Sequence, residues 1–244
     1  MSVLRNAFVY TFMNLKSNLS STTAILLFAQ SEEKESTLKP IASSYKQNVS
    51  LWKKMNDKSL KIIQKTKLPY FISDENDQVG ETFGDRITHS IQTIFDKGFE
   101  KVIVVGNDCI ELKAHHLLQA EQDLNVNELV LGSDYSGGAY LIGVTKLKFK
   151  SELFKTIPWQ TKAVFNALQT LYKQETIAYL PYLNDCNNAF DLKRATQKLS
   201  FSDSFKNIIL SFLTNFVIQN DFETIFDSSH YRASDFNKGS PCNV

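Results

Sequence analysis

Two continuous apolar runs in the sequence predict buried strands. They are AILLFA at residues 24–29 and VIVV at residues 102–105. Both runs are too short for a helix and lack polar alternation, so we expect helices to cover both of their faces, as in parallel sheets. Residues 102–105 are expected to form the central strand, with parallel neighbours. Further strands are predicted over residues 68–73, 128–131, 139–144 and 176–180.

Helices are predicted where apolar residues recur every three or four positions. Between residues 84 and 97, Ile87, Ile91 and Phe95 share one face, and Gly98 suits a left-handed C-cap. Residues 31–40, SEEKESTLKP, predict a polar loop. The alternation of strands and helices predicts an α/β fold, with a mostly parallel sheet between layers of helices. Other helices are predicted over residues 48–67, 113–124, 151–155, 161–172 (capped by Thr161) and 201–226.

Length and composition bound the organisation and the partners of the chain. At 244 residues and 43% hydrophobic content, it can bury one large core. The formal net charge of +1 gives no support for nucleic-acid binding, and no apolar run is long enough to span a bilayer. We expect an N-terminal extension over residues 1–23, a main domain over residues 24–200, and a C-terminal helix and tail over residues 201–244.

The cysteines indicate the redox setting. Cys109, Cys186 and Cys242 are odd in number and widely spaced, which suits neither a disulfide framework nor a CxxC zinc site. A reducing cytoplasm is therefore the expected location.

Candidate chemistry lies at the end of the predicted central strand. Asp108 follows that strand closely, and ligands of open α/β sheets bind at the C-terminal edge. Asp108 either serves such a ligand or caps the following turn. Gly137 and Gly138 either form a turn between strands or let a ligand approach the backbone. Trp159 either stacks on a ligand or packs in the core or a lid.

Five segments together resemble a known family. The chain is similar to the bacterial GT-A-like glycosyltransferases of the selenodomain-associated type, which are distantly related to molybdenum-cofactor guanylyltransferases. The resemblance covers about residues 24–199, and the order and spacing of the segments make it specific. The segments are GETFGDRI (80–87), VVGNDCIEL (104–112), LGSDYSGGAYLIGV (131–144), IPWQT (157–161) and NDCNNAFDL (184–192).

The resemblance implies a nucleotide-diphospho-sugar transferase fold with a C-terminal helical extension. It implies a nucleotide at the C-terminal ends of the strands and a divalent ion, Mg²⁺ or Mn²⁺, held by carboxylates. Carried over by position, the metal ligands would be Asp108, Asp185 and Asn187. The nucleotide-binding residues would be Lys34, Lys39, Arg86, Gly137 and Gly138. No catalytic residue is assigned.

The chain departs from the family pattern at several of these positions. The loop after the first strand has Lys34 and Lys39 but no glycine or arginine, and its three glutamates would oppose an anion. Ser136 stands where the family has an aspartate before two glycines, and Asn187 replaces a second aspartate. Positive and negative charges are thus both reduced, although an amide oxygen can still bind Mg²⁺.

These observations leave two functions open. One is a metal-dependent glycosyl- or nucleotidyltransferase that uses a nucleotide or nucleotide-sugar and an unidentified acceptor. The other is a catalytically degenerate GT-A-like protein kept for binding or assembly. The C-terminal helix carries a wide apolar stripe that either packs on the chain's own domain or forms a homodimer. The stripe consists of Ile208, Ile209, Phe212, Leu213 and Phe216.

Overall fold

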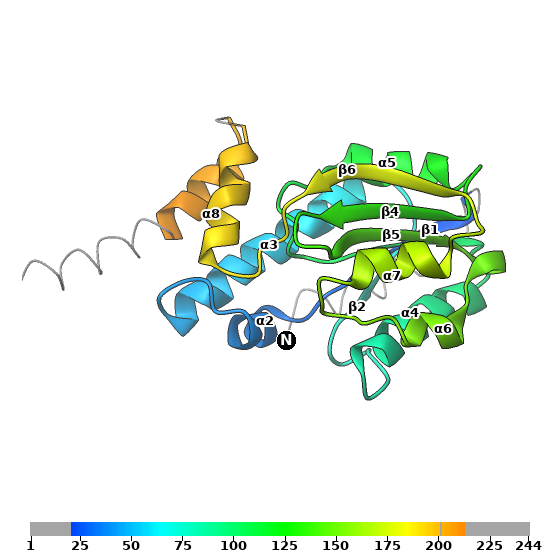
Figure 1. Ribbon diagram of the computed structural model, residues 1–244. Helices are drawn as coiled ribbons and strands as arrows, with labels where there is room; N and C mark the ends of the chain where they lie inside the picture. Colours follow the sequence, from blue (N-terminus) through cyan, green and yellow to red (C-terminus); the bar gives the residue numbers. More distant parts are fainter. Residues whose placement is uncertain (1–20, 201, 213–244) are drawn as a thin grey trace, which may run out of the picture.

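A mixed six-stranded sheet forms the centre of the computed structural model, which describes residues 21–200 and 202–212 (Figure 1). The strand order is β2-β1-β3-β5-β4-β6. The resemblance to a GT-A-like sheet predicted this class of fold. The strands are β1 (Thr23–Phe28), β2 (Tyr70–Ser73), β3 (Lys101–Val105), β4 (Leu129–Asp134), β5 (Ala139–Thr145) and β6 (Ile177–Leu183).

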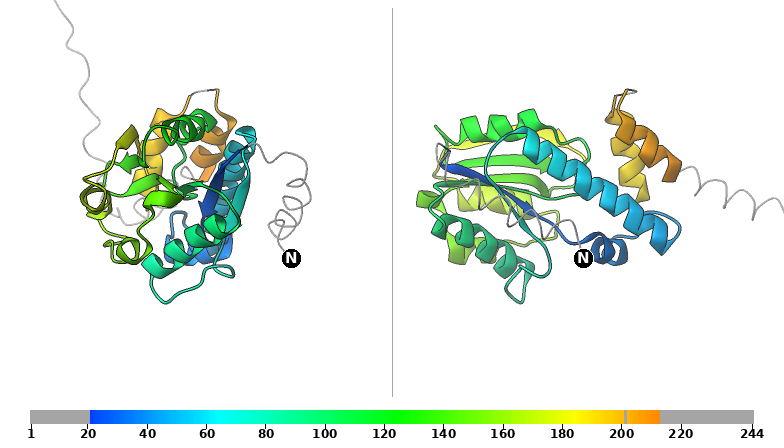
Figure 2. Two further views of the ribbon diagram at one scale, coloured as in Figure 1. Left: turned by 90° about the vertical axis from the view of Figure 1, so that its right-hand side faces the viewer. Right: turned by 180° about the vertical axis from the view of Figure 1, so that it is seen from behind.

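Helices cover both faces of this sheet. In Figures 1 and 2, α4, α6 and α7 lie on one face, and α3 and α5 lie on the other. The helices are α2 (Glu32–Leu38), α3 (Tyr45–Lys65), α4 (Phe83–Asp96), α5 (Ala114–Asp123), the 3-10 helix η1 (Lys146–Lys148), α6 (Ser151–Lys155), α7 (Val164–Leu171) and α8 (Ala189–Lys198). A further helix covers residues 204–212. Within the described residues, no helix has the length and apolar character needed to cross a membrane.

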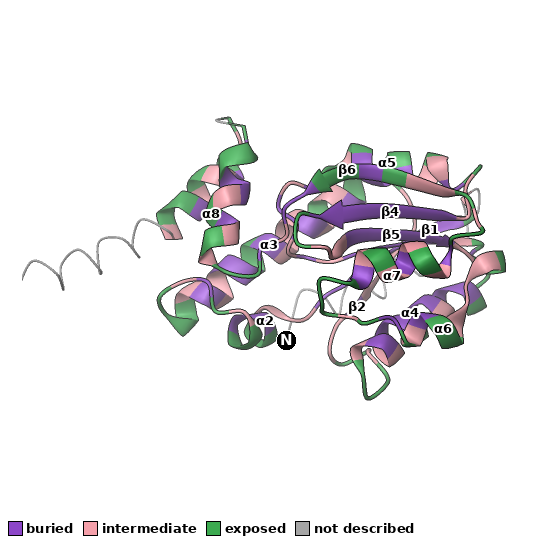
Figure 3. Cartoon of the chain, viewed as in Figure 1, coloured by how far each residue is buried: buried purple, intermediate pink, exposed green. Residues whose placement is uncertain are grey.

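The central strand β3 is buried on both faces, as predicted. Val102 and Val104 pack with the residues of α4, α6 and α7, whereas Ile103 and Val105 pack with those of α3 and α5. Successive side chains of a strand point to opposite faces, so an unbroken apolar run supplies both cores at once. Figure 3 shows the resulting band of buried residues through the sheet.

The expectation of parallel neighbours on both sides of β3 is wrong on one side. β1 is parallel to β3, but β5 is antiparallel to it and also to β4. The short turn between β4 and β5 reverses the chain, so β5 inserts between β3 and β4. Burial on both faces depends on the helical layers rather than on strand direction, and the apolar run could not show the reversal. The C-terminal ends of the other strands consequently share one edge.

Two local expectations are also wrong. Residues 32–38 form helix α2 instead of a loop: Ser31 caps it by accepting a hydrogen bond from the Lys34 N–H, and acidic residues fill its first turn. So short a helix shows no apolar period. Helix α7 is capped at Ala163, and Thr161 does not begin it. The Thr161 hydroxyl instead donates to the Pro158 carbonyl and accepts from the Ala163 N–H.

The C-terminal part of the described chain packs on α3. Ile209 is fully buried in a cluster with Trp52 of α3 and Leu192 of α8, and Phe212 packs against it partly buried. The expected burial of Ile209 within the chain is therefore confirmed, and its contact is with helices rather than with the sheet. Leu213 and Phe216, which continue the predicted stripe, lie outside the described residues.

His116 offers a test of this packing through pH. The side chain is buried, and its Nδ1 atom accepts a hydrogen bond from the Lys113 N–H at 3.1 Å. Burial, and then the neighbouring charges of His115 and Lys113, lower the pKa of His116 to about 4 from an ordinary 6.5. The folded protein thus keeps His116 neutral while the unfolded chain takes up a proton below pH 6.5.

We predict that stability falls between pH 6.5 and pH 4 through this residue. His116→Gln should remove that part of the loss, so that wild type loses about 1–2 kcal/mol more than the variant between pH 7 and pH 4.5. Urea unfolding at the two pH values measures the difference. An equal loss in both proteins would contradict the assignment.

Candidate functional site

The shared edge of the sheet collects acidic side chains from three strands. Asp108 follows β3, Asp134 ends β4, and Asp185 follows β6. The parallel directions of β3, β4 and β6 bring these three ends to the same place, where open α/β sheets bind ligands. We call Asp108, Asp134 and Asp185 the carboxylate cluster.

Backbone and side-chain contacts hold the cluster together. The Cys186 N–H donates to the Asp108 carbonyl at 3.0 Å, which fixes the loop after β6 against the loop after β3. The carboxyl groups of Asp185 and Asp134 share a hydrogen bond. The structure therefore brings the predicted residues Asp108 and Asp185 together and adds Asp134, which the sequence reasoning missed.

Asp134 is held in place by the turn that follows it. Its Oδ1 atom accepts hydrogen bonds from the N–H groups of Ser136, at 2.6 Å, and Gly138, at 2.8 Å. A Cβ atom on Gly138 would lie 2.6 Å from Asp134 Oδ2, and Gly137 has a φ of +92° beside the Lys162 carbonyl. The two predicted glycines thus form the turn between strands and also shape the cluster.

Asp185 occupies the most strained electrostatic position. Its Oδ1 atom is buried and has no hydrogen-bond partner among the described residues. Burial raises the pKa of Asp185 well above its ordinary range, and the charges of Asp108 and Asp134 raise it further, while Lys39 opposes them. At neutral pH this carboxyl group retains a proton, which it shares with Asp134. An added cation would relieve the same strain.

Lys39 already supplies one positive charge. Its Nζ atom lies 2.6 Å from Asp108 Oδ2, in a hydrogen-bonded ion pair. Burial acts to lower the pKa of Lys39, but the charges of Asp108 and Glu35 and the hydrogen bond raise it above its ordinary value. Lys39 therefore remains charged next to the cluster. Sequence reasoning had assigned it to a nucleotide phosphate.

Glu35 is a second residue that the sequence reasoning did not select. The residue is buried on α2, and burial followed by the charge of Asp108 raises the pKa of its carboxyl group. Lys39 and a hydrogen bond with Asn107 act in the opposite direction. Asn107 in turn donates to Asn56 Oδ1 of α3 at 2.7 Å. A glutamate every few residues in a polar segment gives no signal of which one turns inward.

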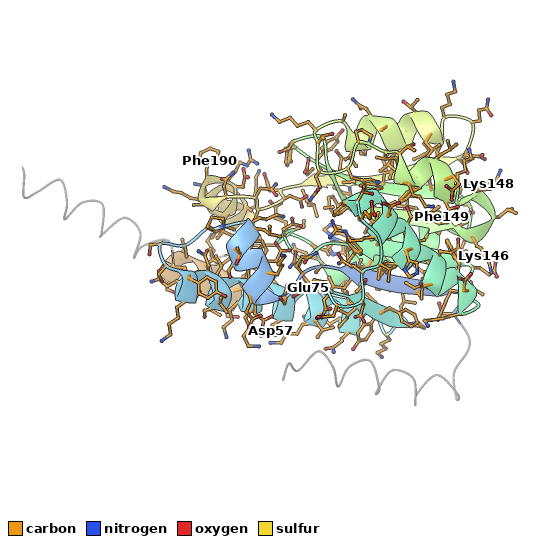
Figure 4. All side chains as sticks on the ribbon, turned by 90° about the horizontal axis from the view of Figure 1, so that it is seen from below. Asp57, Glu75, Lys146, Lys148, Phe149 and Phe190 are labelled. Carbon is orange, nitrogen blue, oxygen red and sulfur yellow. The ribbon has the colours of Figure 1, made fainter. Side chains whose placement is uncertain are left out.

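The loop after β2 closes against the start of α2. The Ser31 N–H donates to Glu75 Oε2 at 2.7 Å, and the Ser31 hydroxyl also bonds to Glu75. Figure 4 shows Glu75 beside this region, with Lys146 and Lys148 at the far end of the sheet from Phe190 of α8. The basic residues of η1 are thus remote from the cluster.

Three predicted site residues stand apart from the cluster. Lys34 is exposed on α2, and Arg86 in the first turn of α4 donates from Nε to the Thr82 carbonyl. Asn187 is exposed. Within residues 21–200 and 202–212, no hydrogen bond or ion pair joins any of the three to Asp108, Asp134 or Asp185. Lys34 and Arg86 nevertheless belong to helices that begin at this edge.

Trp159 packs in the core. Its ring centroid lies 5.5 Å from that of Phe83 and 5.0 Å from that of Phe154, and its Nε1–H donates to the Phe154 carbonyl at 2.9 Å. The structure supports the core alternative for Trp159 and gives no contact that would leave its ring to a ligand.

The chemistry of the cluster fits a divalent cation. Among the described residues, no three His, Cys, Asp or Glu side chains converge as a ready metal site. The donors are nevertheless carboxylate oxygens, which Mg²⁺ and Mn²⁺ prefer, and one of them is buried without a partner. Lys39 holds Asp108 in the present arrangement. The residues fit a cation whose entry requires their rearrangement.

We predict that Asp185→Asn stabilises the ligand-free protein. A carboxyl group with a raised folded-state pKa loses stability as pH rises above its ordinary value, because the unfolded chain ionises freely and the folded chain does not. An amide removes that loss. At pH 8 the variant should gain on the order of 1 kcal/mol, or about 2–4 °C in melting temperature, with a smaller gain at pH 5.

Scanning calorimetry at both pH values checks this prediction. Asp96→Asn is the matched control, because Asp96 is exposed at the end of α4 and its replacement should give no such pH-dependent gain. A variant at Asp185 that is less stable than wild type at pH 8 would show that the ionised carboxylate is favourable where it lies.

Comparison with known proteins agrees with this arrangement. The sequence profile of a family described as "Uncharacterized protein conserved in bacteria (DUF2064)" matches residues 53–161, less than half of the chain. The matched segment includes Asp108 and Asp134 but neither Lys39 nor Asp185. A search of curated proteins found no match.

Solved structures share the fold. A "putative nucleotide-diphospho-sugar transferase" from Desulfovibrio desulfuricans G20 is 22% identical with a TM-score of 0.72, over 82% of this chain and 98% of that chain. Molybdopterin-guanine dinucleotide biosynthesis protein A from Archaeoglobus fulgidus is 12% identical with a TM-score of 0.36, over 71% and 95%. Rv0371c from Mycobacterium tuberculosis H37Rv, in complex with manganese, is 7% identical with a TM-score of 0.45, over 72% and 99%. The chain has the GT-A-like, nucleotide-diphospho-sugar transferase fold that its sequence resemblance implied.

Proposed function

We propose that the protein is a metal-dependent transferase. It binds a nucleotide or nucleotide-sugar at the C-terminal edge of the sheet and transfers a glycosyl or nucleotidyl group to an acceptor that is still unidentified. The observation that carries this proposal is the carboxylate cluster at that edge, with the buried and unpartnered Oδ1 atom of Asp185. The shared fold supports it, although fold alone does not imply function.

Asp108, Asp134 and Asp185 would hold Mg²⁺ or Mn²⁺, with Asn187 on the same loop as Asp185 as a further oxygen donor. When bound, such an ion neutralises charge that develops on the leaving diphosphate. The protein's own part is to keep the oxygens in position. The N–H groups of Ser136 and Gly138 fix Asp134, and the Cys186 N–H fixes the loop that carries Asp185.

The donor's phosphates require positive charge as well. Lys34 and Arg86 lie near the starts of α2 and α4, which both begin at the edge of the sheet that carries the cluster. We propose that they contact the outer phosphate, and that Gly137 and Gly138 line the same site. Asp185 would release its proton when a cation enters, because the cation favours the ionised carboxylate.

A degenerate binding protein is the second candidate. Its support is the ion pair between Lys39 and Asp108, which neutralises a proposed metal ligand without any bound molecule, and Asn187 in place of a carboxylate. Both candidates fit a reducing cytoplasm, the location that we propose, because Cys109 and Cys186 are free thiols that lie buried next to two of the cluster residues.

Thermal unfolding with a panel of nucleotides and nucleotide-sugars separates the two candidates. We predict that Mg²⁺ or Mn²⁺ together with the correct nucleotide raises the melting temperature of wild type. A ligand at about 100 times its Kd stabilises by roughly 2.7 kcal/mol, or about 5–10 °C here. Asp108→Asn should abolish the metal-dependent part, and the control Asp96→Asn should keep it.

Each other result is informative. No shift in wild type with any nucleotide at millimolar concentration favours the binding-protein candidate over the transferase. A metal-dependent shift that survives Asp108→Asn, in a variant whose circular dichroism matches wild type, would place the metal elsewhere.

A further inference from the structure

We propose that Lys39 is the resident counter-ion of the carboxylate cluster, and that a divalent cation reaches Asp108 only by displacing it. The inference rests on the proposed function for the identity of the cation. It goes beyond that function by assigning Lys39 to the protein's own carboxylates rather than to a donor phosphate.

The position of Lys39 is built into the fold. The residue caps the C-terminus of α2, and its carbonyl accepts a hydrogen bond from Trp52 Nε1 at 3.1 Å. Trp52 is fully buried in α3, and the Lys39 ammonium lies 5.8 Å from its ring centroid. The backbone is thereby pinned, and the side chain extends 2.6 Å from Asp108 Oδ2. An exposed lysine free to sample solvent would not be anchored in this way.

The charges around Lys39 explain why it stays there. Asp108 is its hydrogen-bonded partner, and the charges of Glu35 and Asp185 act on it as well. Asp134 adds a further carboxyl group through its hydrogen bond with Asp185. One ammonium group therefore faces several carboxyl groups, and the cluster attracts cations even with Lys39 in place.

Displacement of Lys39 has a defined route. A divalent ion on Asp108 would repel the ammonium group, which occupies the same oxygen. Glu35, buried on the same helix and already within electrostatic range of Lys39, offers it a second partner. The ion must nevertheless break a charge-assisted hydrogen bond before it binds, so its apparent affinity is reduced.

Mn²⁺ binding to the full chain without nucleotide tests this inference. Free Mn²⁺ can be measured by electron paramagnetic resonance. Lys39→Gln should bind Mn²⁺ at least tenfold more tightly than wild type, because Asp108 then lacks its competitor. The matched control is Lys34→Gln, which removes an equal charge from the exposed face of the same helix and should leave the affinity unchanged. Adding Asp108→Asn to Lys39→Gln should abolish the gain.

A second variant guards against misfolding of Lys39→Gln, whose carboxyl groups repel one another without the lysine. Glu35→Gln combined with Lys39→Gln removes one charge of each sign and keeps the local balance. It should also bind Mn²⁺ more tightly than wild type. If a folded variant lacking Lys39 binds Mn²⁺ no more tightly than wild type, the inference is overturned.

The outcome is separable from that of the proposed function. Tighter Mn²⁺ binding without any nucleotide effect would retain the inference on Lys39 and remove the transferase proposal. A metal-dependent nucleotide shift with unchanged Mn²⁺ affinity in the lysine variants would do the reverse.

Discussion

The structure depends on how like charges are tolerated at one edge of a sheet. Parallel strands deliver Asp108, Asp134 and Asp185 to the same place, and carboxylates in a half-buried setting repel one another. Two devices answer that repulsion in the ligand-free protein. A proton stays on Asp185, and the ammonium of Lys39 lies on Asp108. Both are replaceable by a cation, which is why the cluster reads as a binding site rather than as a structural ion pair.

The rest of the fold serves to hold those groups still. Helix α3 anchors Lys39 through Trp52 and supports Asn107 through Asn56. The reversal at β5 matters in the same way, because the tight turn that produces it also directs two N–H groups at Asp134. A wholly parallel sheet would need a long crossover at that point and would not place such a turn beside the acid.

The sequence predicted what rests on local periodicity. Unbroken apolar runs predicted β1 and β3, and the spacing of Ile87, Ile91 and Phe95 predicted α4 with its Gly98 terminus. It also predicted that Asp108 and Asp185 would meet, since each follows a strand. It could not predict the direction of β5, because strands buried on both faces have the same pattern in either orientation.

The misses at the site have one physical origin. Asp134 was read as part of a turn and Glu35 as part of a loop, because polar residues carry no period that shows which side chains face inward. Their roles arise from long-range contacts: Asp134 with Asp185, and Glu35 with Lys39 and Asn107. The acidic segment after β1 was expected to repel a phosphate. In the structure its one inward glutamate instead helps to keep a lysine charged beside Asp108, so the loss of basic residues from this segment and the retention of Lys39 form a single electrostatic arrangement.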